Sequence, residues 1–273
     1  MNTLMEMLSY PFVMRAFLVG IPVSLCAALL GVSLVLRRYS MIGDGLSHVG
    51  FGALAIAAAL NLAPLGVTIP VVIISAFFLL RITEDNKING DAAIAMISTG
   101  SLALGVLIIS VTKGMNTELN NYLFGSILAM SNSDMWVSII LSAIVLVVFV
   151  LHYNTVFSVT FDEQFAKATG VKTSFFNTLI AVLTAVTVVL GMRMMGSMLI
   201  SALIIFPALT SMQIFKTFKA VTLSSAVLSV VCFITGLIVS CFWEVPAGAC
   251  VVVVNIAAFL IFYILSAILK INN

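Results

Sequence analysis

The chain has 273 residues, of which 62% are hydrophobic and only 8% are charged, and its mean hydropathy is +1.26. This composition excludes a water-soluble globular domain and indicates an integral membrane protein that is surrounded by the lipid bilayer. The formal net charge of +2 is small and dispersed along the chain, so no nucleic acid is expected as a partner.

Apolar runs long enough to cross a bilayer recur along the chain. A helix needs about 20 apolar residues to cross the roughly 30 Å hydrocarbon layer. We therefore predict an all-α, polytopic membrane helix bundle of about eight or nine transmembrane helices, forming a single transmembrane domain over residues 1–273. Nine predicted spans lie near residues 12–36, 46–62, 64–80, 92–112, 135–152, 175–192, 197–215, 220–241 and 247–269.

An acid and an imidazole lie four residues apart close to the start of the second predicted span. Asp44 and His48 belong to the segment LRRYSMIGDGLSH at residues 36–48. Residues four apart share one face of a helix, so both side chains could reach one ion, and ionisable groups at membrane depth mark ion or substrate paths. The structural alternative is that Asp44 caps the helix and that His48 hydrogen-bonds a backbone carbonyl or Ser47.

Two polar connections between predicted spans contain apolar side chains of their own. Residues 113–133 predict an amphipathic surface helix or a lid. Residues 153–174 form the longest polar connection on the predicted cytoplasmic side, and their centre at 161–171 predicts a short helix. That helix could pack on the membrane surface or dock a cytoplasmic partner. Pro207, within the seventh span, predicts a kink that serves as a hinge or accommodates packing.

The distribution of basic residues predicts the orientation of the chain. Cytoplasmic loops retain Lys and Arg, and placing the carboxyl end inside the cell puts nine of the twelve basic residues there. The amino end is then outside. The nine are Arg37, Arg38, Arg81, Lys87, Lys167, Lys172, Lys216, Lys219 and Lys270.

Four segments together resemble the permeases of the manganese, zinc and iron chelate-uptake family of ABC importers. They are residues 36–48, LFGSIL at 123–128, FDEQFAKATG at 161–170 and GSMLISALIIFPA at 196–208. The resemblance covers nearly the whole chain and implies a type II ABC importer permease in the plasma membrane of a prokaryote. It implies a permease domain rather than an enzyme, and the sequence contains no Gly-x-x-x-x-Gly-Lys-Ser/Thr phosphate loop.

The resemblance also implies that Asp44 and His48 line the metal path, because they fall on the Asp-x-x-x-His positions of similar permeases. Two residues from each of two facing permeases would supply four ligands, a temporary shell that suits zinc. The expected cargo is a divalent transition metal moved by alternating access, with zinc slightly favoured over manganese and no permanently bound cofactor.

Similar permeases carry an ATPase-coupling helix where this chain has residues 161–170. The resemblance therefore implies coupling roles for Phe161, Asp162, Glu163, Phe165, Ala166 and Gly170. The implied partners are cytoplasmic ABC ATPase subunits, a second permease copy in a homodimer, and an extracytoplasmic metal-binding protein. ATP hydrolysis is expected in the separate ATPase subunits.

Two other functions fit part of the sequence. A type II importer permease for chelated iron or a corrin-like cofactor would share the fold but would need a wider path without direct ligands. An intramembrane metalloenzyme would use His and acid residues catalytically, yet the chain has only two histidines and no His-Glu-x-x-His pattern. Competition between free metal and chelate separates the two importer hypotheses.

Overall fold

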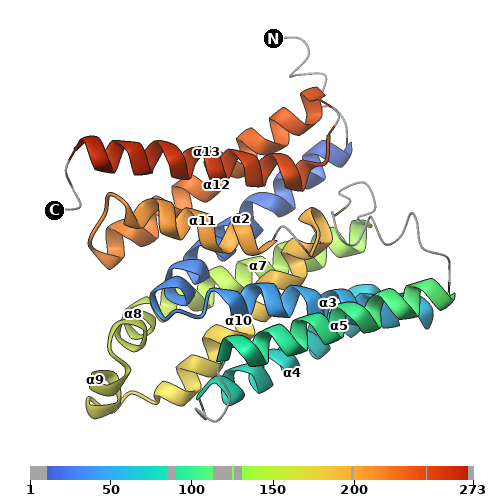
Figure 1. Ribbon diagram of the computed structural model, residues 1–273, viewed down its shortest axis with the longest axis horizontal. Helices are drawn as coiled ribbons and strands as arrows, with labels where there is room; N and C mark the ends of the chain where they lie inside the picture. The colour runs from blue at the N-terminus through green and yellow to red at the C-terminus, as the bar shows by residue number, and fades with distance from the viewer. Residues whose placement is uncertain are drawn as a thin grey trace.

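The computed structural model is a bundle of α-helices (Figure 1) and describes residues 11–84, 90–112, 125, 131–197, 200–243 and 245–269. Those residues contain helices and no strands, which confirms the predicted all-α class. Most of the predicted outer surface helix over 113–133 lies outside the described residues. Within the described ranges, eight helices are long and apolar enough to span a membrane: α2 (Pro11–Leu36), α3 (Met41–Ala59), α4 (Pro64–Glu84), α5 (Gly90–Thr112), α7 (Asn132–Leu151), α10 (Thr173–Met195), α12 (Phe218–Trp243) and α13 (Ala247–Ile268).

Three of these helices form the centre of the bundle. In their most apolar stretch, 67% of the residues of α2 and 72% of those of α3 and α10 are buried. The corresponding share is between 17% and 39% in α4, α5, α7, α12 and α13, whose exposed side chains are mainly apolar and suited to lipid. Most side chains on α2, α3 and α10 are therefore held inside protein.

The seventh predicted span is shorter than the sequence predicted. The prediction covered residues 197–215, whereas α11 (Ile200–Met212) has 13 residues and is about 20 Å long. Gly196, which has a φ of +92°, ends α10 just before it. Because α11 contacts α2, α12 and α13, this short helix is held inside the protein rather than exposed to lipid.

Pro207 lies inside α11, and the helix continues on both sides of it. A proline has no N–H to donate to the carbonyl one turn earlier, so this helix is locally weakened. The hydroxyl of buried Ser225 on α12 donates to the Pro207 carbonyl at 3.2 Å. The hinge at Pro207 stays a prediction.

Two short helices connect α7 to α10, where the sequence predicted one helix over 161–171. They are α8 (Tyr153–Phe161) and α9 (Glu163–Ala168). Asp162 between them is extended, with a φ of −147°, and its carboxylate accepts a hydrogen bond from the Phe165 N–H at 2.8 Å. This cap starts a new helix, so Phe161 ends α8 instead of beginning α9.

Candidate functional site

Asp44 and His48 lie on the same face in the first two turns of α3. Asp44 Oδ2 and His48 Nε2 are 3.7 Å apart, and the two side chains are 33% and 13% exposed. This separation is longer than a hydrogen bond. Two ligands of a tetrahedral zinc ion lie roughly 3.4 Å apart, because each is about 2.1 Å from the metal. The pair is thus spaced to bind one divalent cation with only a small adjustment.

A serine from a distant part of the chain completes the surroundings of Asp44. Ser201, in the first turn of α11, donates its hydroxyl to Asp44 Oδ1 at 3.1 Å. The Ser47 hydroxyl instead donates to the backbone carbonyl of Asp44 at 2.7 Å. The carboxylate therefore has Oδ1 toward Ser201 and Oδ2 toward His48. The sequence offers no signal for Ser201 except its place in the segment 196–208.

The contacts of Asp44 and His48 differ from the purely structural roles of a helix cap and a hydrogen-bonded core histidine. The N-cap residue of α3 is Ser40, four residues before Asp44, so Asp44 does not cap this helix. Its carboxylate accepts from Ser201 instead. His48 Nδ1 is buried and has no hydrogen-bond partner among the described residues. Since most buried polar atoms are hydrogen-bonded, His48 differs from a histidine that is fixed in a core by its own hydrogen bonds.

A single chain supplies only part of a metal-binding set. Among the described residues, no three His, Cys, Asp or Glu side chains are grouped closely enough to hold a metal ion. Asp44 and His48 offer one oxygen and one nitrogen, fewer than the four ligands of a structural zinc site.

The contact with Ser201 places Asp44 inside the bundle. Ser201 is at the start of α11, and the other end of that helix, Met212, precedes the predicted cytoplasmic residues Lys216 and Lys219. At 1.5 Å per residue, Ser201 is about 16 Å along the helix from Met212. Asp44 therefore lies well away from that end, although it is in the first turn of its own helix.

The residues predicted to couple to an ATPase lie together around α9. Phe161 and Phe165 are 70% and 62% exposed, whereas Ala166 is fully buried and anchors the opposite side of α9. Gly170 follows α9 with a φ of +89°, a conformation that glycine adopts without a steric penalty. Two aromatic rings therefore face outward, one at the end of α8 and one on α9, while buried Ala166 holds the other side of α9.

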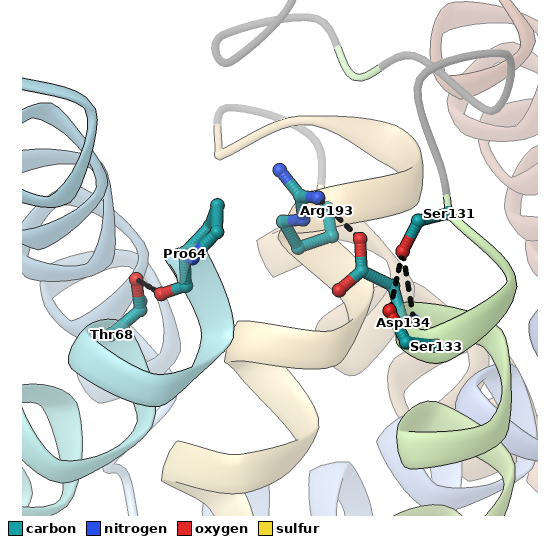
Figure 2. Close-up of polar contacts among 6 residues, drawn as sticks. All are labelled: Pro64, Thr68, Ser131, Ser133, Asp134 and Arg193. Carbon is teal, nitrogen blue, oxygen red and sulfur yellow. Dashed lines mark hydrogen bonds and ion pairs between the residues drawn. The ribbon is translucent and has the colours of Figure 1, made fainter. Parts of the chain in front are cut away.

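An ion pair joins α7 and α10 where α7 begins and α10 ends. Figure 2 shows the side chains of Asp134 and Arg193 pointing toward one another. Arg193 Nη2 lies 2.8 Å from Asp134 Oδ2. Ser131 caps α7 by accepting from the Asp134 N–H at 3.1 Å. On the other side of Arg193, Thr68 donates to the Pro64 carbonyl within α4, so that contact stays inside one helix.

Replacing Asp134 with asparagine should lower the melting temperature of the purified protein. Both side chains of the pair are less than one fifth exposed, and Arg193 would lose its charged partner. The expected loss of stability is roughly 1 to 3 kcal/mol, less than for a fully buried pair. Asp91→Asn, which changes an exposed acid in the first turn of α5, is the matched control. Equal melting temperatures for the two variants would show that the Asp134–Arg193 pair contributes nothing.

Comparisons with known proteins cover almost the whole chain. The model of the ABC 3 transport family matches residues 9–266. The manganese import system permease protein ScaB of Streptococcus gordonii is 30% identical over 257 residues, which cover 94% of this chain and 92% of ScaB. The high-affinity zinc uptake system membrane protein ZnuB of Haemophilus influenzae is 29% identical over 246 residues, which cover 90% of this chain and 94% of ZnuB. The solved structure of PsaBC from Streptococcus pneumoniae in complex with Fab has a TM-score of 0.89 and 28% identity, and the alignment covers 100% of this chain and 99% of that one.

Proposed function

Because this chain belongs to the ABC 3 transport family, we propose that it is the membrane subunit of an ATP-driven importer that moves manganese or zinc into the cell past Asp44 and His48. The similar proteins are named as permease and membrane proteins of manganese and zinc systems, not as enzymes. The observation that carries the proposed path is the pair of cation ligands 3.7 Å apart on a central helix.

The ligand chemistry favours zinc as the cargo. Imidazole nitrogen and carboxylate oxygen both bind zinc, which accepts four ligands, whereas manganese is more often bound by a larger set of oxygen ligands. Two facing copies of this chain would provide two carboxylates and two imidazoles. Named relatives include systems for each ion, so the choice of zinc rests on the ligand set alone.

The exposed rings on α8 and α9 support docking of a cytoplasmic ATPase. Phe161 and Phe165 are apolar and largely exposed, and the segment lies in the connection that the basic residues assign to the cytoplasm. A second copy of the chain would complete the ligand set, and a metal-binding protein outside the cell would deliver the cargo. The proposed importer thus consists of a permease homodimer, two ATPase subunits and one delivery protein.

Uptake by a reconstituted complex tests the proposed function. The permease and its ATPase would be placed in proteoliposomes, with the delivery protein added on the side that corresponds to the outside of the cell. ATP-dependent uptake of zinc and manganese would be measured in competition, with and without a chelator. We expect uptake of the free ion, with zinc outcompeting manganese. Uptake of only the chelated metal would favour a chelate importer, and the reverse order of the two ions would overturn the choice of zinc.

Replacing Ser201 with alanine should raise the metal concentration required for half-maximal uptake by about tenfold. The hydroxyl donates to Asp44 Oδ1, and loss of a group that orients a metal ligand commonly costs a factor of 10 to 100 in affinity. Ser110→Ala is the control, because Ser110 donates only to the Val106 carbonyl within its own helix. Identical concentration dependence in the two variants would exclude an orienting role for Ser201.

A further inference from the structure

Three side chains from three separate segments of the chain form a closed ring of hydrogen bonds at the start of α9. Arg37 follows α2 directly, Glu163 begins α9 and Asn177 is on α10. Arg37 donates from Nη1 to Asn177 Oδ1 and from Nη2 to Glu163 Oε2, both at 2.6 Å. Asn177 Nδ2 donates to Glu163 Oε1 at 3.0 Å. Each of the three residues thus binds both of the others, and we call this set the Arg37 triad.

The Arg37 triad is more than a surface ion pair. The side chain of Arg37 is 10% exposed and Asn177 is 2% exposed, while Glu163 is 44% exposed. A guanidinium at this depth needs its partners, because a buried charge without hydrogen bonds is costly. The planar guanidinium of Arg37 donates from its two terminal nitrogens in fixed directions. It therefore fixes the position of the Glu163 carboxylate as well as balancing its charge.

Arg37 belongs to a tight turn that leads directly into α3. Within that turn, Tyr39 donates its N–H to the Leu34 carbonyl at 2.8 Å, and Arg38 adopts a positive φ of 61°. The Arg37 guanidinium also lies 5.3 Å from the centre of the Tyr39 ring. Only three residues separate Arg37 from Met41, where α3 begins, and hydrogen bonds stiffen the turn that contains them. A displacement of Arg37 is therefore expected to move the start of α3.

The outer side of α9 is available to a partner. Phe165, two residues after Glu163, is largely exposed, whereas Ala166 is fully buried. A partner that presses on Phe165 therefore displaces a short helix whose first residue is bound to Arg37. The path continues from Arg37 through the turn to α3, where Asp44 and His48 lie in the first two turns.

We infer that Arg37, Glu163 and Asn177 are positioning residues that transmit the displacement of α9 to α3 and thereby change the placement of Asp44 and His48 during each transport cycle. This inference rests on the proposed importer function. The triad does not bind the metal, so its loss should uncouple ATP hydrolysis from metal movement without removing the metal-binding pair.

Glu163→Gln in the reconstituted complex tests the triad. This substitution keeps the shape of the side chain and removes its charge. The number of metal ions imported per ATP hydrolysed should fall at least about tenfold, the size of effect expected when a charge-assisted hydrogen bond is lost. Hydrolysis of ATP should continue while uptake falls, and co-purification of the ATPase reports whether the complex is assembled. A fall in uptake and hydrolysis together, with an unchanged ratio, would indicate a structural role and overturn the inference.

A charge exchange provides the second variant. Arg37→Glu and Glu163→Arg each place like charges together and should uncouple transport, whereas the double variant should recover at least about half of the wild-type ratio. The combined length of the two side chains is the same after the exchange, and the Asn177 side chain offers both a donor and an acceptor. A double variant that transports no better than either single variant would overturn the inference. This test still applies if the Glu163→Gln complex fails to assemble.

The control separates this inference from the proposed function. Asp134→Asn breaks an ion pair at the far end of α10 and should leave the ratio of metal to ATP unchanged. Absence of metal uptake by the assembled wild-type complex would refute the importer function itself. Normal wild-type uptake with an unchanged ratio in Glu163→Gln would refute the triad alone.

Discussion

Replacing Asp44 with asparagine is expected to reduce ATP-dependent metal uptake at limiting metal by at least about 100-fold. Asparagine has the shape of aspartate and its amide oxygen can still accept from Ser201, so the packing of α3 against α11 is retained. It carries no negative charge and is a much weaker ligand for a divalent cation. The measurement is the initial rate of zinc and manganese uptake into proteoliposomes.

A second variant and a matched control make that result specific. His48→Ala should abolish uptake to the same extent, because the imidazole is the other ligand in reach of the cation. Asp91→Asn removes an exposed carboxylate from the first turn of α5 and should transport normally. The site would be refuted if both the Asp44 and the His48 variants took up metal at the wild-type rate.

Gly31→Ala is expected to disrupt the packing of α11 against α2. A Cβ atom at Gly31 would lie 2.0 Å from the backbone carbonyl oxygen of Ile204, so the two helix backbones must separate by more than an ångström. Overpacking of this kind costs roughly 1 to 3 kcal/mol, and more when backbone must move. Ser201 is one turn from Ile204, so the shift also carries its hydroxyl away from Asp44.

Melting temperature and uptake measured together test the effect of Gly31→Ala. Both should fall, since the same close contact supports the bundle and the site. Gly100→Ala is the control, because a Cβ there meets no atom within 4 Å and α5 is one of the outer helices. If Gly31→Ala melted at the same temperature as Gly100→Ala, the close approach of α2 and α11 would be wrong.

Hydropathy predicted the membrane helices because it depends only on local composition. The runs around α2, α5, α12 and α13 each contain a long, mainly apolar stretch, so their existence does not depend on their neighbours. The start of α3 was harder to predict. The sequence placed that span at 46–62, whereas the helix begins at Met41, because Gly43, Asp44 and Gly45 weaken the apolar signal although buried contacts support the helix.

Contacts between distant segments could not be predicted from composition or spacing. Ser201 and Asp44 are 157 residues apart, and Arg37 and Glu163 are 126 residues apart. Most helices in this chain have apolar side chains on every face, so the sequence does not show which faces meet. For the same reason, the sequence indicated Asp44 and His48 as a pair but did not show that Ser201, within the segment 196–208, donates to the Asp44 carboxylate.

X-ray absorption spectroscopy of the zinc-loaded permease complex most directly tests the claim that Asp44 and His48 hold the transported metal. One zinc ion per pair of permease chains is expected, with nitrogen and oxygen ligands at about 2.0 to 2.2 Å and the outer-shell scattering of imidazole. His48→Ala should remove the imidazole signal and the bound ion. A wild-type spectrum without imidazole scattering, or one that is unchanged in His48→Ala, would contradict the account.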